Sequence, residues 1–202
     1  MNRFDKAAKT WDSKPSSVAI AKACVKNIQK FIDIEKNINI LDYGCGTGLV
    51  SIALSNEKNQ VLGMDYSKGM VDTFNEKIQK LGFDNIKAIK HDIHNEDFKE
   101  NSYDLITINM ALHHLEDTSV FIKECKKSLK KDGFLCINDL DKEDGTFHSK
   151  HKNEGVFHFG FSKDELCDLL KKNGFEIIDY KIVLIDKRNE KQYPIFNLIA
   201  KL

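Results

Sequence analysis

The stretch that decides the fold is Ile38-Asn-Ile-Leu-Asp-Tyr-Gly-Cys-Gly-Thr-Gly48, in which a short apolar run ends at Asp42 and alternating glycines. An apolar run of this length is typical of a buried strand. Glycines directly after a strand allow a tight turn and a close approach of the backbone to a ligand at the start of a helix. We therefore predict a strand up to Leu41, a ligand-binding loop over residues 42–48, and a helix that continues to about Ser55.

Strands and helices alternate along the rest of the chain. A first helix is expected behind Pro15, because apolar residues from Val18 to Ile32 recur at helical spacing. Further strands are expected at residues 61–64, 86–89, 103–110, 134–137, 177–185 and 193–202. Repeated strand-then-helix units imply parallel strands with right-handed crossovers, so the predicted fold class is α/β, a doubly wound sheet with helices on both faces.

The last two strands are connected differently from the others. Only residues 186–192 separate them, and this polar stretch is too short for a parallel crossover. We therefore expect a seven-stranded, mostly parallel sheet with an antiparallel last strand.

Several residues are expected to begin or end helices. Ser67 is placed to cap a helix that Gly82 ends, and Gly133 is expected to end a helix that starts near Thr118. The sequence Ser162-Lys-Asp-Glu165 has the spacing of a capping box, in which two side chains satisfy the first free N–H groups of a helix.

Length and composition indicate one intracellular domain spanning residues 1–202. The chain is 41% apolar, and its 31 basic residues balance 31 acidic ones, so there is no cationic surplus for nucleic acid. Five isolated cysteines fit a reduced compartment rather than a disulfide scaffold or zinc finger. The N-terminus has no apolar segment of the kind that a signal peptide or membrane span needs. We expect a cytoplasmic protein with no membrane partner.

The spacing of the glycines discriminates between nucleotide ligands. A dinucleotide fingerprint, GxGxxG, would place its third glycine at position 49, where this chain has Leu49. The observed pattern is DxGxGxG, with Asp42 before the first glycine. A carboxylate there would repel a pyrophosphate but suits a ligand that carries a cationic ammonium group.

Acids also follow the next two strands. Asp65 lies about twenty residues beyond the loop, where a carboxylate can accept hydrogen bonds from both hydroxyls of a ribose. Asp92 and Ile93 follow the third strand, and an acid beside an apolar side chain suits an adenine. Asn109 is expected at the end of the fourth strand, opposite the glycine loop.

Together these motifs resemble the class I S-adenosylmethionine-dependent methyltransferases, over nearly the whole chain. Asp42 to Gly48 looks like the first motif of that family, and residues 103–115 are similar to its fourth. The opening residues 4–12 resemble the N-terminal lid of its small-molecule branch, which includes quinone-biosynthesis-type enzymes. The resemblance implies a lid and helix over residues 1–35 and a Rossmann-like core over residues 36–202. It also implies S-adenosylmethionine as cofactor, S-adenosylhomocysteine as product, and a small-molecule acceptor.

The predicted cofactor contacts are Trp11, Asp42, Gly44, Gly46, Gly48, Asp65, Tyr66, Met70, Asp92, Ile93, Asn109 and Met110. Trp11 has two interpretations. It is either a buried residue that fixes the entry to the first long helix, or a lid residue whose aromatic face attracts the sulfonium by about 0.5–2 kcal/mol.

Histidines are the candidate catalytic residues, namely His113, His114 and His158. We expect only one of His113 and His114 to face the cleft, since consecutive residues of a helix point in different directions. The loop over residues 139–161 holds further acids and histidines, including Asp139, Asp141, His148 and His151, but their spacing matches no zinc pattern. No metal site is predicted.

Other functions stay open as alternatives. They are a nicotinamide-linked (NAD) oxidoreductase, which Leu49 disfavours, and a non-catalytic S-adenosylmethionine-binding regulator. A protein or RNA methyltransferase has no support in a recognition domain, a basic surplus or an Asn-Pro-Pro-Tyr-type motif after the fourth strand. The acceptor atom is not specified by the sequence, and a monomer or homodimer is expected.

Overall fold

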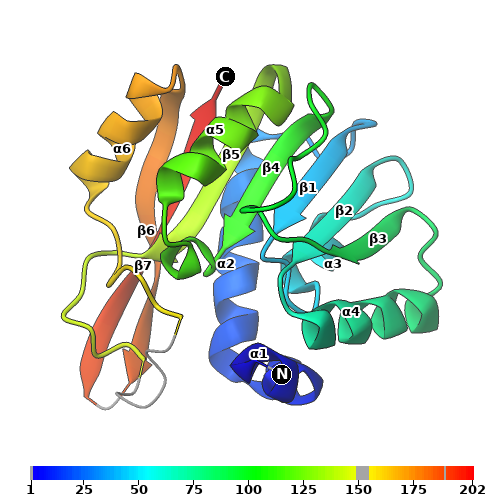
Figure 1. The fold of residues 1–202 in the computed structure, drawn as a ribbon, viewed down its shortest axis with the longest axis horizontal. Helices are drawn as coiled ribbons and strands as arrows, with labels where there is room; N and C mark the ends of the chain where they lie inside the picture. The colour runs from blue at the N-terminus through cyan, green and yellow to red at the C-terminus, as the bar shows by residue number, and fades with distance from the viewer. Residues whose placement is uncertain (1, 149–154, 189) are drawn as a thin grey trace.

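Seven strands form one sheet in the order β3-β2-β1-β4-β5-β7-β6 (Figure 1). The computed structural model describes residues 2–148, 155–188 and 190–202. The strands are β1 (Asn39–Tyr43), β2 (Gln60–Asp65), β3 (Ile86–Lys90), β4 (Tyr103–Asn109), β5 (Leu129–Leu140), β6 (Glu176–Arg188) and β7 (Lys191–Lys201). Strands β1 to β5 pair in parallel, whereas β7 is antiparallel to both β5 and β6. The predicted fold class is confirmed, including the antiparallel last strand.

Helices cover both faces of this sheet (Figure 1). They are α1 (Arg3–Ala7), α2 (Pro15–Phe31), α3 (Leu49–Leu54), α4 (Lys68–Leu81), α5 (Thr118–Ser128) and α6 (Lys163–Lys172), with 3₁₀ turns η1 (Ala8–Ser13) and η2 (Leu112–His114). One buried cluster joins the sheet to α2, α3 and α4, and a second joins it to α5 and α6.

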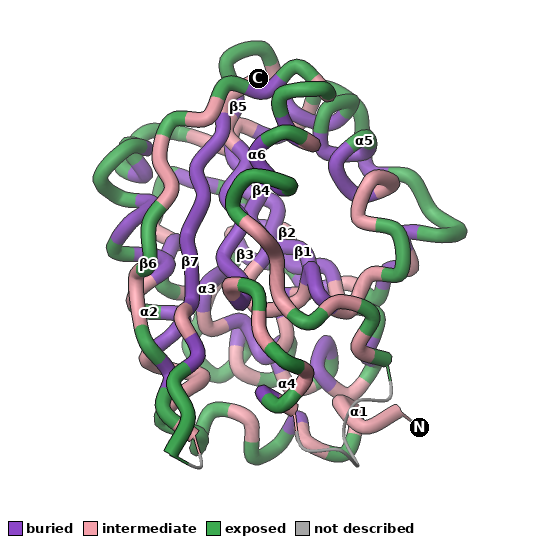
Figure 2. The backbone as a smooth tube through the Cα atoms, turned by 90° about the vertical axis from the view of Figure 1, so that its left-hand side faces the viewer, coloured by how far each residue is buried: buried purple, intermediate pink, exposed green. Residues whose placement is uncertain are grey.

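The two clusters form because successive side chains of a strand point to opposite faces of the sheet. In β1, Ile40 belongs to the cluster under α2 to α4, whereas Leu41 and Tyr43 belong to the cluster under α5 and α6. Phe74 of α4 and Phe121 of α5 are fully buried, one in each cluster. Burying a side chain of this size contributes about 1.5–3 kcal/mol. The tube in Figure 2 shows β7 and β4 buried along most of their length, as expected for central strands between two helical layers.

The predicted helix ends are partly correct. Ser67 accepts a hydrogen bond from the Met70 N–H, and Gly82 ends α4 with a left-handed φ of 75°. Gly133 does not end α5, because that helix stops at Ser128 and β5 starts at Leu129, with a register shift against β4. The predicted capping box at Ser162 is wrong, since its side chain makes no cap hydrogen bond.

All five cysteines are free and buried. Burial raises the pKa of the Cys45 and Cys125 thiols well above the usual value. Among the described residues, no helix has the length and apolar character needed to cross a bilayer.

Candidate functional site

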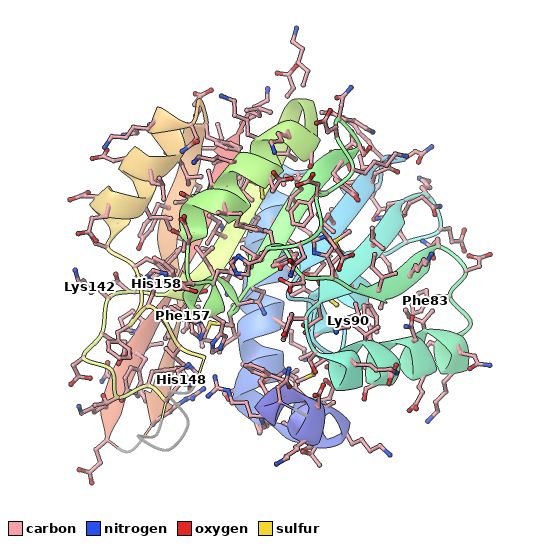
Figure 3. The ribbon with its side chains drawn as sticks, viewed as in Figure 1. Phe83, Lys90, Lys142, His148, Phe157 and His158 are labelled. Atoms are coloured by element: carbon pink, nitrogen blue, oxygen red, sulfur yellow. The ribbon has the colours of Figure 1, made fainter. Side chains whose placement is uncertain are left out.

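The carboxyl ends of β1 to β5 meet at one edge of the sheet, and the predicted site residues gather there. Figure 3 shows His148 and His158 on the loop between β5 and α6 at this edge, with Lys90 at the end of β3. In open parallel sheets this edge is where ligands bind. The glycine loop lies at the end of β1, which has β2 on one side and β4 on the other.

Each glycine of the loop has a left-handed backbone, and two of them are also tightly packed. A Cβ on Gly48 (φ 82°) would lie 2.1 Å from the Phe74 ring, and a Cβ on Gly44 would lie 2.4 Å from the Cβ of Ala111. Gly46 (φ 54°) differs, because a Cβ there would meet only the Met70 sulfur, at 4.0 Å. The loop therefore packs against the protein at its two ends and leaves space for a ligand at Gly46.

Asp65 joins the end of β2 to this loop. Its Oδ2 atom accepts a hydrogen bond from the Gly46 N–H at 2.8 Å, and its Oδ1 atom accepts one from the Ser67 N–H at 2.8 Å. Burial raises the pKa of Asp65, while these two hydrogen bonds act in the opposite direction. A carboxylate has about four lone-pair sites, so two remain for ligand hydroxyls.

Asp42 is more deeply buried, with 1% of its surface exposed. Its Oδ2 atom accepts a hydrogen bond from the Ser51 hydroxyl at 2.5 Å, and its Oδ1 atom has no hydrogen-bond partner among the described residues. Burial raises the pKa of Asp42 to about 7, and the nearby carboxylate of Asp65 adds to this. A buried carboxylate with an unsatisfied oxygen is costly, and a cationic ligand would lower that cost.

The remaining predicted cofactor contacts lie along the same edge. Ile93 is buried, and Asp92 accepts hydrogen bonds from the His94 N–H and the Asn95 amide. The Asn109 amide oxygen accepts from Asn138 at 2.7 Å. The others are Met70, which is 2% exposed, Tyr66, which is 59% exposed, and Met110, which has φ 53°.

The N-terminal segment 2–13 lies across this edge and contacts the loops that carry the site. Asp5 accepts hydrogen bonds from the Ser67 hydroxyl and the Gly69 N–H at the start of α4. Asp12 accepts one from the hydroxyl of Thr47, within the glycine loop. Trp11 is partly buried and meets Phe4 edge-on at a ring separation of 6.1 Å. By contrast, α2 contributes Cys24 and Ile28 to the core and is not part of this cover.

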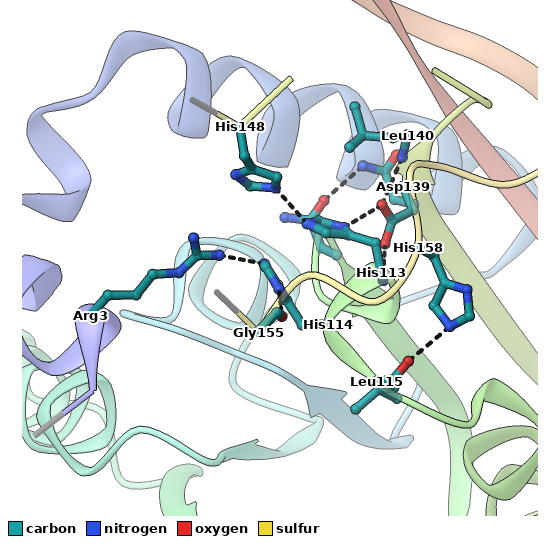
Figure 4. Close-up of polar contacts among 11 residues, drawn as sticks. Arg3, His113, His114, Leu115, Asp139, Leu140, His148, Gly155 and His158 are labelled. Carbon is teal, nitrogen blue, oxygen red and sulfur yellow. Dashed lines mark hydrogen bonds and ion pairs between the residues drawn. The ribbon is translucent and has the colours of Figure 1, made fainter. Parts of the chain in front are cut away.

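A cluster of histidines lies where β4 and β5 end (Figure 4). The Nδ1 atom of His113 is 2.6 Å from the Asp139 carboxylate, and both residues are almost fully buried. The Nε2 atom of His113 is 3.1 Å from Nε2 of His148. The loop before α6 is held against this cluster, because the N–H groups of Phe157 and His158 both donate to the His113 carbonyl.

His114 joins the same cluster, and it is less buried than His113, which packs against Asp139. Its ring lies 4.0 Å from that of His113 between centroids, because both belong to the short 3₁₀ turn η2. Its Nδ1 atom is 2.5 Å from the Gly155 carbonyl, and its Nε2 atom is 3.4 Å from the Arg3 guanidinium. Burial lowers the pKa of His114 to about 2 and that of His148 to about 3, with the nearby His113 acting in the same direction.

His158 stands apart from this cluster. Its Nε2 atom is 2.9 Å from the Leu115 carbonyl, and its ring packs on Phe161 (Figure 4). Its polar atom is therefore already engaged by the backbone. His151, considered in the same loop, lies outside the described residues.

Comparison with known proteins identifies the family. A family model described as a methyltransferase domain matches residues 34–197. The chain belongs to this methyltransferase family. The resemblance to class I S-adenosylmethionine-dependent methyltransferases is thereby confirmed.

Individual relatives agree with this family. A Schizosaccharomyces pombe methyltransferase described as uncharacterized is 33% identical over 150 residues, which cover 68% of this chain and 53% of that protein. A ubiquinone/menaquinone biosynthesis C-methyltransferase of Campylobacter jejuni is 29% identical over 192 residues, covering 79% of each chain. The chain spans 53 to 62% of the length of the first three curated relatives. A crystal structure of a SAM-dependent methyltransferase from Aquifex aeolicus shares the fold, with a TM-score of 0.73, 24% identity, and coverage of 98% and 97%.

Several residues of this candidate site escaped the sequence prediction. Arg3, Asp5 and Asp12 were part of a segment predicted as a lid, but charge alone does not show which loops they bind. Asp139 and His148 were considered only as loop residues, since no spacing rule connects them to His113. A sequence signal was nevertheless present, because Asp139 comes two residues after the strand predicted at 134–137; in the structure it lies within β5 and is 0% exposed.

Proposed function

We propose that this chain transfers a methyl group from S-adenosylmethionine to a small-molecule acceptor. The observation that carries the proposal is the pair of acids beside the glycine loop, the buried Asp42 and the partly buried Asp65, with Asp65 hydrogen-bonded to Gly46. The methyl donor carries a sulfonium and an ammonium group, and a site with two nearby carboxylates favours cations.

The residues present fit this donor. The lone pairs that Asp65 has left can accept the ribose hydroxyls. Ile93 and Met70 offer apolar surface for the adenine ring, and the space at Gly46 lets the backbone approach the ligand. The Oδ1 atom of Asp42, at the end of β1, has no hydrogen-bond partner among the described residues, and its charge would favour the ammonium end of the donor.

When bound, the donor supplies a methyl group on a positively charged sulfur, which is a good leaving group. The chain then has to orient the acceptor and exclude water. Orientation of this kind can lower a barrier by about 7–11 kcal/mol. Segment 2–13, which we propose as the N-terminal lid, is held over the site by Asp5 and Asp12 and would exclude water there.

The names of the relatives favour a quinone-type acceptor. Besides the Campylobacter protein, a demethylmenaquinone methyltransferase of Staphylococcus aureus is 30% identical over 137 residues, with 65% of this chain and 56% of that protein covered. We propose that the acceptor lies beside His113 and His114, because Ala111 in the preceding turn packs directly on Gly44 of the loop. His158 is a weaker candidate, since its ring nitrogen contacts a backbone carbonyl.

Two rival functions make different predictions about ligands. A nicotinamide-linked oxidoreductase needs a loop that tolerates pyrophosphate, which the buried acid at position 42 opposes. A non-catalytic regulator would bind the donor but would not transfer its methyl group.

Calorimetry with S-adenosylmethionine, S-adenosylhomocysteine and NADH tests donor binding. The first two should bind in the micromolar range, and Asp65→Asn should weaken them at least about tenfold, through loss of charge-assisted hydrogen bonds. Asp84→Asn is the matched control, because Asp84 is exposed and precedes β3 at the opposite end of the sheet. No binding by the wild type, or equal binding of NADH, would contradict the proposal.

Transfer itself is tested with donor carrying a labelled methyl group. A demethylated quinol and a panel of small phenols, amines and thiols serve as acceptors. Labelled product with any of them supports catalysis. Tight donor binding without transfer to any acceptor favours the regulator.

A further inference from the structure

The histidine cluster has the composition of a metal centre. One ring nitrogen each of His113, His114 and His148 lies within 4.8 Å of the other two. We propose that these three side chains bind a divalent transition-metal ion of the zinc type, with one coordination position left open.

The spacing of the nitrogens fits such an ion. With metal–nitrogen bonds of about 2.0–2.1 Å in a tetrahedron, two ligand nitrogens lie about 3.3 Å apart. The Nε2 atoms of His113 and His148 are 3.1 Å apart. His114 completes the set after a small rotation, because all three atoms already lie within 4.8 Å. Three imidazoles and no thiolate favour zinc, cobalt, nickel or copper over magnesium or calcium.

The partners on the outer side of the rings fix which nitrogen faces inward. The Nδ1–H of His113 donates to the buried Asp139 carboxylate, so its Nε2 lone pair faces the cluster. In the same way, Nδ1–H of His114 donates to the Gly155 carbonyl, which leaves its Nε2 lone pair inward. Carboxylate or carbonyl partners of this kind commonly orient metal-binding histidines. Two of the three ligands are therefore already oriented.

Arg3 marks the open side of the cluster. Its guanidinium group lies 3.4 Å from Nε2 of His114 (Figure 4). The positive charge of Arg3 therefore occupies the position next to the nitrogen that would bind the metal. Arg3 belongs to the N-terminal lid, and a metal ion would have to replace it there. We therefore expect Arg3→Gln to bind the metal at least as tightly as the wild type.

The open position suits an anionic oxygen or sulfur. An ion with three neutral ligands stabilises a deprotonated hydroxyl or thiol. Resting on the proposed function, this would make the metal the group that activates an acceptor. For a hydroxyl acceptor, the acceptor's hydroxyl group would lose its proton to solvent. The acceptor oxygen would then bond to the methyl carbon of the donor, and the carbon–sulfur bond would break with its electrons on sulfur.

The proposal is tested with untagged protein that has been stripped with a chelator, so that no affinity tag supplies histidines. Zinc content after loading and desalting gives the stoichiometry, and titration with Co²⁺ gives the visible absorption of a four-coordinate site. We expect about one metal per chain for the wild type. His148→Ala should weaken binding more than tenfold, and Asp139→Asn should weaken it about 10- to 100-fold.

His94→Ala is the matched control, because His94 is exposed and its backbone N–H, not its ring, bonds to Asp92. It should bind metal as the wild type does. His148 lies in a surface loop, so its replacement is not expected to unfold the chain, and circular dichroism checks this. Metal binding that is absent in the wild type, or unchanged in His148→Ala, would overturn the proposal.

Donor binding by the chelator-treated protein separates this proposal from the proposed function. Calorimetry with S-adenosylmethionine on the metal-free wild type should still show micromolar binding, because the donor residues lie on the glycine loop, β2 and β3. Donor binding without metal binding rejects only the metal site. Metal binding without donor binding rejects the methyl-transfer proposal and leaves the metal site standing.

Discussion

The hydroxyl of Thr47 donates a hydrogen bond of 2.5 Å to the carboxylate of Asp12, which ties the N-terminal lid to the glycine loop. Lys77 of α4 forms a salt bridge with the same carboxylate. The two partners of Asp12 come from the elements that flank the proposed cofactor site, so this single side chain helps to close it.

Replacing Asp12 should therefore speed the release of the cofactor. For Asp12→Ala we expect S-adenosylhomocysteine to dissociate about three- to tenfold faster, because a partly exposed charged contact is worth about 1 kcal/mol. Stopped-flow displacement measures this rate. Glu57→Ala removes an exposed carboxylate between α3 and β2, away from the lid, and should leave the rate unchanged. Equal rates for Asp12→Ala and the wild type would show that the lid does not retain the ligand.

Asp42 should make the protein less stable as the pH rises. The pKa of Asp42 in the folded protein, about 7, lies above the ordinary value of 3.8. The favourable contribution of Asp42 to the free energy of unfolding is therefore complete below pH 3.8, and it is lost as the pH rises to about 7. Asp42→Asn removes this loss and keeps an oxygen for the Ser51 hydroxyl. Three pKa units at 1.36 kcal/mol each set an upper limit of about 4 kcal/mol on the gain above pH 7.

Urea unfolding of both proteins at several pH values tests this prediction. The stability advantage of Asp42→Asn should grow by about 2 kcal/mol between pH 5 and pH 8. A constant difference between the two proteins would mean that Asp42 is already ionised at pH 5. The same variant should bind S-adenosylmethionine more weakly, since it lacks the charge proposed to attract the ammonium group.

Gly48 and Gly82 provide a matched pair for backbone strain and packing. Both have left-handed φ values, 82° and 75°. Replacing either by alanine costs about 1–2 kcal/mol for the backbone alone. A Cβ on Gly82 meets nothing within 4 Å, whereas one on Gly48 lies 2.1 Å from Phe74. Gly48→Ala should therefore be less stable than Gly82→Ala by a further 1–3 kcal/mol or so, measured by thermal unfolding. Equal losses would show that Phe74 moves aside freely.

Ser67 caps a helix and also contacts the lid, and a comparison with Asp117, which caps another helix, can separate the effects of these two roles. It caps α4 through the Met70 N–H and also donates to Asp5 of the lid. Asp117 caps α5 through the Ser119 N–H. Both Ser67→Ala and Asp117→Ala should lose about 0.5–2 kcal/mol of stability. Only Ser67→Ala should also release the cofactor faster. If Asp117→Ala shows the same faster release, then helix stability rather than the lid contact controls it.

The fold was predictable because its determinants are local in the sequence. The apolar run before Asp42 and the glycines after it define β1 and its loop, and the short connection before Tyr193 requires an antiparallel pair. The early start of β5 was not predictable, because residues 129–133 join the sheet only through an irregular register with β4. The prediction that Gly133 ends a helix is therefore wrong, because Gly133 lies within β5.

The cofactor edge of the site was also predictable, since strand ends in a parallel sheet must converge. The histidine cluster was not. His113 and His148 are 35 positions apart, and they meet only because the Asp139 carboxylate and the loop before α6 pack around η2. Side-chain orientation within a 3₁₀ turn, which brings His114 into the same group, is likewise a property of the folded chain.

The burial of all five cysteines gives this protein a set of internal reporters of its own opening motions. A thiol reacts with an alkylating reagent only as an exposed thiolate, so the buried cysteines can be labelled only when the surrounding structure opens. Cys45 lies in the core under α2 to α4, and Cys125 in the core under α5 and α6. Their labelling rates, followed residue by residue by mass spectrometry, would show which of the two helical layers detaches first.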